Sequence, residues 1–138
     1  MGQKENKCGI VKLDNTSFSL YNLSSDEGLF DLYYFVDHRG KAPVEEFIIS
    51  LPAKERSKVF AYIHKLQHEG YNLRRPMADY LGNGIYELRP KANRIFFFFF
   101  LKDSIVLLHA IRKKTYAVPS SDLELCLKRK AQVEGGQI

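Results

Sequence analysis

The stretch Gly84–Thr115, GIYELRPKANRIFFFFFLKDSIVLLHAIRKKT, decides the fold. It contains the most apolar run in the chain, Ile95–Leu101, with Arg94 just before it. Because successive side chains of a strand point to opposite faces, a run this apolar predicts a strand that is central in a sheet and covered on both faces. The stretch ends on three cations, Arg112, Lys113 and Lys114. Positive charge at both ends of an apolar strand suits a buried sheet whose rim meets an anion.

Turn signals divide this stretch into three short strands. We expect strands at 85–89, 94–101 and 105–111, with turns at 90–93 and 102–104. The triplet Gly82-Asn83-Gly84 before them is a strong turn signal, and it ends a connection that begins at Asn72. Strands joined by such short turns form an antiparallel meander.

The chain before this meander predicts one more strand and two helices. Leu29–Val36 is rich in aromatic residues and is typical of a strand. Pro43 suits the first position of a helix, and Gly70 suits a C-terminal cap. Between them, apolar residues recur at helical spacing on either side of Pro52, which indicates two amphipathic helices joined with little or no loop: Val44, Phe47, Ile48 and Leu51, then Val59, Ile63 and Leu66.

A final helix follows the meander. Val118-Pro119 ends the sheet, and Ser121 with Glu124 forms a capping box. Cys126 lies on the apolar face of this helix, where we expect a small buried residue rather than a reactive thiol. The fold class is therefore α+β: a twisted antiparallel sheet, made of an N-terminal strand and the meander, with a two-helix hairpin and a C-terminal helix.

The basic charge of the chain is unevenly placed. Its 138 residues fit one domain, and the net charge is +5. Residues 84–138 hold ten basic and five acidic groups, a net of +5, whereas residues 1–30 hold three and four. This bias favours phosphate-bearing partners, although composition alone favours an ordinary solvated face.

Two further features of the chain bear on its location. Cys8 and Cys126 form no metal-ligand spacing, and two isolated cysteines favour a reducing cytosol. The first residues are polar, so we expect no signal peptide, and the phenylalanine run is far shorter than the roughly 20 residues that span a bilayer. Alternating residues at 11, 13, 18 and 20 give a weak signal for a short hairpin near the N-terminus.

From about Tyr33 to Val133, the chain resembles the HigB-like branch of the RelE/ParE toxin superfamily, often described as phage-derived proteins. The matching pieces occur in family order: 39–47 (RGKAPVEEF), 51–52 (LP), 81–89 (LGNGIYELR), Arg94 with its aromatic strand, 107–111 (LLHAI), 113–115 (KKT), and Pro119 with the basic last helix. Residues 1–28 fall outside the resemblance, and their frequent Ser, Asn, Asp and Gly predict an N-terminal extension that is partly disordered. The resemblance implies one RelE/HigB-like domain over residues 29–138.

The resemblance also implies a function. Members of that branch are typically toxins of type II toxin–antitoxin systems, neutralised by a helix-turn-helix, HigA-like antitoxin. They resemble RelE in cutting mRNA on the ribosome, in the cytoplasm, by attack of the 2′-OH without metal or cofactor. Some relatives on the same fold act on DNA gyrase instead, so fold alone does not fix the target. A non-catalytic binding module, either a gyrase-type toxin or an inactive phage remnant, is the alternative, and a basic nucleic-acid-binding domain without toxicity is a third reading.

Cutting RNA in this way requires fixed cations for the phosphate, and arginine with its planar fork of donors suits that task. Arg94 matches the family arginine that is thought to clamp the phosphate; the alternative is a structural arginine paired with Glu87. Arg89 could add to the same patch. Lys113 and Lys114 match basic residues that follow the third strand in relatives, but adjacent strand residues point to opposite faces, so only one of them can face a given site.

Three residues are candidates for proton transfer. Glu87 stands where relatives often have a lysine, so it is either a proton acceptor or a partner that holds Arg89 or Arg94. Histidine as a residue type has a pKa that suits a general base at neutral pH. The apolar neighbours of His109 instead favour a core histidine whose hydrogen bonds are satisfied within the protein. Tyr116 could stack on a base or act as a lid over the core.

The remaining cations are candidates for contacts with RNA phosphates: Arg74, Arg75, Arg112, Lys128 and Arg129. Such contacts would be non-specific and sensitive to salt. A solvated basic face is the favoured reading for each of these residues taken singly.

Overall fold

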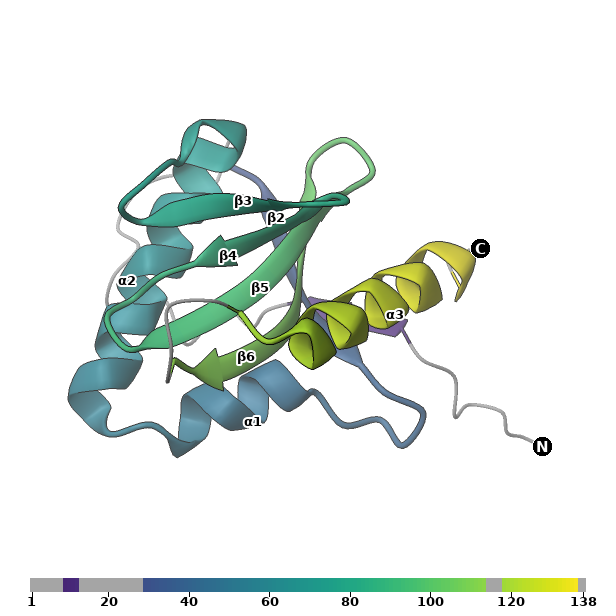
Figure 1. Cartoon of the computed structure of the whole chain (residues 1–138), viewed down its shortest axis with the longest axis horizontal. Coiled ribbons are helices and arrows are strands. Elements are labelled where there is room, and N and C mark those ends of the chain that lie inside the picture. The colour runs from purple at the N-terminus through teal and green to yellow at the C-terminus, as the bar shows by residue number, and fades with distance from the viewer. Residues whose placement is uncertain (1–8, 13–28, 114–117, 137–138) are drawn as a thin grey trace.

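The computed structural model describes residues 9–12, 29–113 and 118–136, and Figure 1 shows their arrangement. Six strands and three α-helices follow one another, with a 3-10 turn η2 after the second helix. In chain order they are β1 (Gly9–Lys12), β2 (Asp31–Val36), α1 (Pro43–Ser50), α2 (Ala53–Glu69), η2 (Gly70–Asn72), β3 (Ala78–Gly82), β4 (Ile85–Leu88), β5 (Asn93–Phe100), β6 (Ser104–Arg112) and α3 (Ser120–Gly136).

The sheet has the strand order β1-β2-β6-β5-β4-β3, so the phenylalanine-rich strand β5 lies inside it. Its residues 95–98 are at most 1% exposed. The prediction of a central strand covered on both faces is therefore confirmed, as is the antiparallel meander β4-β5-β6. The α+β class is confirmed as well, with a sheet that is mostly antiparallel.

Helices cover the two faces of the sheet differently (Figure 1). Ile95 and Phe97 belong to the core that packs under α1 and α2, whereas Phe96 and Phe98 belong to the core under α3. We call these sides the hairpin face and the α3 face. Alternation along β5 thus supplies both cores from one strand, which is why an uninterrupted aromatic run is needed there.

Two features of the sheet depart from the prediction. β3 lies within 72–84, which was expected to be a connection, and it pairs antiparallel with β4. The first strand of the domain was expected in an antiparallel sheet, but β2 pairs in parallel with β6. A parallel neighbour requires a long connection, and the helical hairpin with the first strands of the meander provides one.

The short strand β1 comes from the expected N-terminal extension. It pairs antiparallel with β2, with Gly9 opposite Val36, so part of the extension continues the sheet. The hairpin considered near the N-terminus would need residues 13–20, which lie outside the described residues.

The helical hairpin forms where the apolar spacing places it. Val44, Ile48, Val59, Ile63 and Leu66 are fully buried, and α1 and α2 are separated by two residues, as expected.

Gly70 ends α2 with a φ of +54°, a conformation that glycine adopts without strain. A Cβ atom at this position would also collide with the ring of Phe30.

Cys126 lies in the core under α3 and is 0% exposed. Burial raises the pKa of its thiol to about 12. The thiol therefore stays protonated at neutral pH and packs as a small apolar group, as the sequence predicts.

Candidate nucleic-acid site

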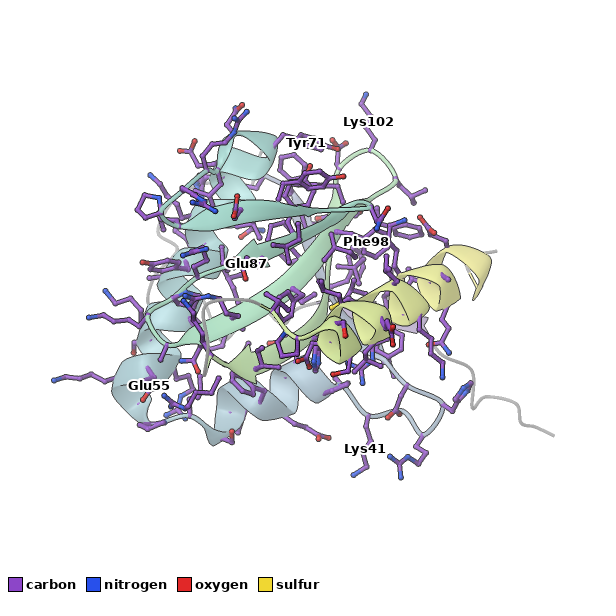
Figure 2. All side chains as sticks on the ribbon, in the orientation of Figure 1. Lys41, Glu55, Tyr71, Glu87, Phe98 and Lys102 are labelled. Atoms are coloured by element: carbon purple, nitrogen blue, oxygen red, sulfur yellow. The ribbon has the colours of Figure 1, made fainter. Side chains whose placement is uncertain are left out.

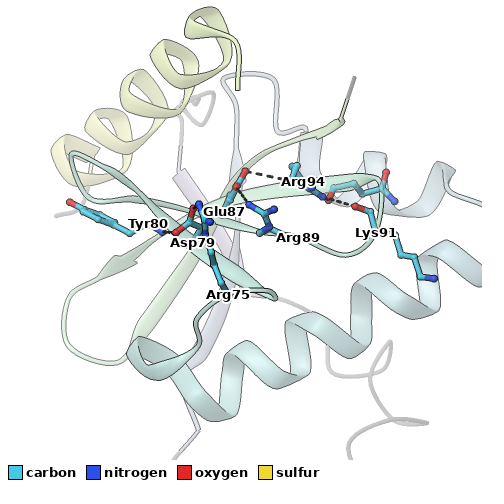
Figure 3. Close-up of polar contacts among 8 residues, drawn as sticks. Arg75, Asp79, Tyr80, Glu87, Arg89, Lys91 and Arg94 are labelled. Atoms are coloured by element: carbon cyan, nitrogen blue, oxygen red, sulfur yellow. Dashed lines mark hydrogen bonds and ion pairs between the residues drawn. The ribbon is translucent and has the colours of Figure 1, made fainter. Parts of the chain in front are cut away.

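The strongest cluster of charged residues lies on the α3 face, where β4 ends and β5 begins. In the register of the sheet, Glu87 of β4 stands opposite Phe96 of β5, and Phe96 stands opposite His109 of β6. Figure 3 shows Glu87 between Arg89 and Arg94 on one side and Asp79 on the other. The cluster, Glu87 with Arg89 and Arg94, therefore joins the end of β4 to the start of β5.

Glu87 holds two arginines. Its Oε2 accepts a hydrogen bond of 2.9 Å from Nη1 of Arg89, and its Oε1 lies 3.9 Å from Nε of Arg94. Glu87 is 4% exposed and Arg94 is 6% exposed. Buried charges persist only when they are paired, so Glu87 has a structural reason to stand at this position. One carboxylate faces two guanidinium groups, which leaves a net charge of +1 in the cluster.

Arg94 is held by backbone as well as by Glu87. Its Nη1 donates to the carbonyl oxygens of Lys91, at 2.6 Å, and of Asn93, at 2.8 Å. Burial lowers the pKa of Arg94, as does the nearby charge of Arg89, whereas Glu87 raises it; an arginine in such a setting still keeps its proton. The guanidinium of Arg94 is therefore a cation that is held in a fixed position and is almost fully shielded from solvent.

One acceptor in this cluster has no hydrogen bond. Oε1 of Glu87 is buried and receives no hydrogen bond from the described residues, and its contact with Arg94 at 3.9 Å is an ion pair only. A buried oxygen of this kind is uncommon and requires an explanation, such as strain, a bound water or a catalytic role.

A second ion pair continues the row toward the sheet edge. Asp79 of β3 stands opposite Glu87 and accepts a hydrogen bond of 2.7 Å from Nη2 of Arg75. That bond is the main cause that lowers the pKa of Asp79. Arg75 is 71% exposed along its side chain, so this pair presents a cation to solvent beside the buried cluster (Figure 3).

His109 has a structural partner, in keeping with the favoured reading of a core histidine. Its Nε2 lies 2.7 Å from Oδ1 of Asp122 on α3, and its ring stacks on Phe96 with the ring centroids 5.8 Å apart. A register shift between Phe96 and Phe97 brings His109 onto the α3 face. The contact with Asp122 fixes the start of α3 against β6.

Among the cations after the third strand, Arg112 lies away from Arg94. Arg112 donates a hydrogen bond of 2.6 Å to Glu55 of α2, which places its side chain on the hairpin face. The amide of Lys113 donates to the carbonyl of Ala92, at 2.6 Å, so its backbone runs beside the β4–β5 turn. Lys114 and Tyr116, the other candidates in this segment, lie outside the described residues.

The other candidate RNA contacts also have distinct settings. Arg129 donates to the carbonyl of Leu108, at 2.8 Å, and lies over the ring of Phe35, so it fastens α3 to the sheet. Lys128 is exposed on α3, and Arg74 is exposed after η2.

Sequence reasoning missed Asp79 and Asp122, the acidic partners of Arg75 and His109. The alternation of 78–82 was the available signal for Asp79, because it would place that residue on the same face as Glu87 once β3 is recognised as a strand. No sequence signal links Asp122 to His109, since the two meet only when α3 packs on the sheet.

In the described residues, a six-stranded, mostly antiparallel sheet with helices on both faces defines a small α+β domain that is compatible with a RelE-like fold. The family model described as "Phage derived protein Gp49-like (DUF891)" matches residues 46–131. The chain belongs to this family, which is part of the RelE/ParE-like toxin superfamily. Among curated proteins, none matches the chain.

None of the helices in the described part of the chain is long and apolar enough to cross a membrane. Within the same residues, no three His, Cys, Asp or Glu side chains gather as a metal-binding group.

Proposed function

We propose that this protein is the toxin of a type II toxin–antitoxin system, of the HigB-like branch, and that it cuts mRNA on the ribosome. The observation that carries the proposal is the cluster of Glu87, Arg89 and Arg94 on one sheet face, in a chain of the Gp49-like family. A helix-turn-helix, HigA-like antitoxin would be its protein partner, and mRNA on the ribosome its substrate.

The chemistry that suits this cluster is attack of a ribose 2′-OH on the adjacent phosphorus. The P–O bond to the 5′ oxygen breaks, which leaves a 2′,3′-cyclic phosphate on one fragment and a 5′-hydroxyl on the other. Negative charge grows on the phosphate oxygens in the transition state, and fixed donors lower the barrier there. The guanidinium of Arg94 is such a donor, and Arg89 is a second.

Proton transfer is assigned to Glu87 in this proposal. Its carboxylate takes the proton from the attacking 2′-OH once bound RNA has opened the buried cluster, and solvent water gives a proton to the leaving 5′ oxygen. The support for this role is that Oε1 receives no hydrogen bond from the described residues while Oε2 is held by Arg89. Arg89 keeps spare N–H groups for the phosphate, because a guanidinium has five donors.

A non-catalytic binding module on the same fold is the second candidate. The observation that favours it is the setting of Arg94, which is 6% exposed and already donates to two backbone carbonyls. In that reading the arginine shapes the β4–β5 turn, and the toxin would act by binding, for example on gyrase.

Translation-dependent cutting tests the proposal. The chain is expressed alone with two messages that differ only in the start codon of a reporter, and primer extension maps new 5′ ends. We expect growth arrest and cutting of the translated message only.

Equal cutting of both messages would contradict dependence on the ribosome. Growth arrest without cutting of either message would support the binding module instead.

A further inference from the structure

A row of contacting aromatic rings lies on the hairpin face near the β3 edge of the sheet. Tyr71 of η2 stacks on Phe99, with the ring centroids 4.0 Å apart and an angle of 28° between the planes. Tyr86 meets the same ring edge-on at 5.1 Å, and Tyr80 lies 4.7 Å from Tyr86. Two tyrosines, from η2 and β4, therefore contact one phenylalanine of β5, and Tyr80 of β3 extends the row through Tyr86.

Two of these tyrosines are exposed although they are large. Tyr71 is 52% exposed and Tyr80 is 54% exposed, and Figure 2 shows Tyr71 at the edge of the molecule where α2 ends. The hydroxyl of Tyr80 accepts a hydrogen bond of 3.0 Å from the amide of Gly84, which fixes its ring. Core packing accounts for Tyr86 and Phe99, but it does not require two open ring faces above them.

The exposed rings line a pocket of about 410 Å³ together with two arginines. Tyr71, Tyr80 and Tyr86 form its aromatic part, Arg74 and Arg75 contribute positive charge, and Asp79, the partner of Arg75, also lines it. Ligand pockets commonly measure roughly 300–1,000 Å³. Flat rings beside guanidinium groups are the combination that binds a base and its phosphate.

We propose that this pocket binds single-stranded RNA, with a base stacked on Tyr71 and the flanking phosphates on Arg74 and Arg75. Single-stranded RNA is favoured over a duplex because its bases can leave the stack and expose their faces. Stacking on tyrosine tolerates any base, so the pocket adds affinity without fixing a sequence.

The pocket adjoins the arginine cluster on the other face of the sheet. Arg75 lines the pocket and pairs with Asp79 at 2.7 Å, and Asp79 stands opposite Glu87 in the sheet. In Figure 3, Arg75 and Asp79 lie next to Glu87 and Arg89, while Tyr80 points away from them. RNA held in the pocket can thus pass over the β3 edge to the cluster. The path of RNA from the pocket to the cluster rests on the proposed function, whereas RNA binding in the pocket does not.

The test measures RNA binding without ribosomes and without cutting. A fluorescently labelled uridine octanucleotide is titrated with the purified full chain, and its anisotropy gives the Kd. We expect Tyr71→Leu to weaken binding by about 5- to 160-fold, as loss of one stacked base does. Tyr71→Phe keeps the ring and is expected to bind like the wild type, and far-UV circular dichroism checks that both variants are folded.

The arginines are tested by the salt dependence of the same Kd. The double variant Arg74→Gln, Arg75→Gln should reduce the slope of log K against log salt by about 1.4, because each contact with a single strand contributes about 0.7. Arg39→Gln is the matched control, since Arg39 is 78% exposed in the loop between β2 and α1, and its slope should equal that of the wild type.

Three outcomes overturn the proposal: no RNA binding by the wild-type chain, wild-type binding by a folded Tyr71→Leu, or equal slopes for the double variant and the control. If Tyr71→Leu does not fold, a loss of binding in Tyr71→Phe or an unchanged slope in the double variant would overturn it as well. If the chain binds RNA through Tyr71 but cuts no message, the result supports the RNA-binding pocket and rejects the endonuclease.

Discussion

Replacement of Arg94 by lysine is expected to remove growth arrest and to lower the rate of message cutting by about 10²–10³-fold. This is the usual effect of losing one donor to a developing oxyanion. Lysine keeps the positive charge beside Glu87 but lacks the planar fork that can hold a phosphate and a carbonyl at once. Growth after induction and primer extension on a translated message measure the two effects.

Lysine is a sharper choice than alanine at this position. Arg94→Ala would also remove toxicity, but it would leave the carbonyl oxygens of Lys91 and Asn93 without their donor and Glu87 with one arginine fewer. Breaking a buried ion pair typically costs about 3–5 kcal/mol, so unfolding alone could remove the activity of that variant.

Arg56→Lys is the matched control for Arg94→Lys. Arg56 also donates to two backbone carbonyls, those of Ile49 and Leu51, both at 3.1 Å. It belongs to α2 on the hairpin face, so the control should remain fully toxic. Undiminished toxicity of Arg94→Lys would show that this arginine is structural.

Replacement of Phe97 by alanine is expected to lower the free energy of unfolding by about 3–5 kcal/mol. Phe97 is 1% exposed in the middle of β5 and stacks on Tyr86, with the ring centroids 5.4 Å apart. Since small domains are stable by only about 5–15 kcal/mol, this variant should lose a large part of its stability. Urea unfolding followed by circular dichroism measures the change.

A surface residue provides the control for Phe97→Ala. Ile49 of α1 is 62% exposed, so Ile49→Ala should change the free energy of unfolding by no more than about 0.5 kcal/mol. A similarly small change for Phe97→Ala would contradict the assignment of β5 as the strand that fills both cores.

The sequence pattern predicted those helices and strands whose own residues determine their structure. The apolar run predicted a strand buried on both faces, and Ile95–Phe100 forms it, whereas Leu101 at its end is 67% exposed in the following turn with a φ of +58°. The turn at Gly82-Asn83-Gly84 marked where the meander begins. The strand β3 was missed because Ala78–Gly82 is short and mixed in character and follows Pro76. The parallel pairing of β2 with β6 depends on the path of the intervening chain, which no local pattern encodes.

The candidate site was predictable in its residues but not in its contacts. Arg89 and Arg94 could be assigned to the ends of neighbouring strands, and Glu87 was a considered partner. The bonds of Arg94 to the β4–β5 turn were not foreseeable, because they depend on the backbone around Lys91, which has a φ of +59°. Arg112 donates a hydrogen bond to Glu55, which lies 57 residues away in sequence. This contact likewise follows only from the packing of α2.

The chemical ends of the cut message test the central claim most directly. Attack by the 2′-OH predicts a 5′-hydroxyl on the downstream fragment and a 2′,3′-cyclic phosphate on the upstream one. It also predicts that a message with a single 2′-deoxynucleotide at the mapped position is not cut there by the chain on purified translating ribosomes. A downstream fragment with a 5′-phosphate, or unchanged cutting of the deoxy-substituted message, would contradict the account.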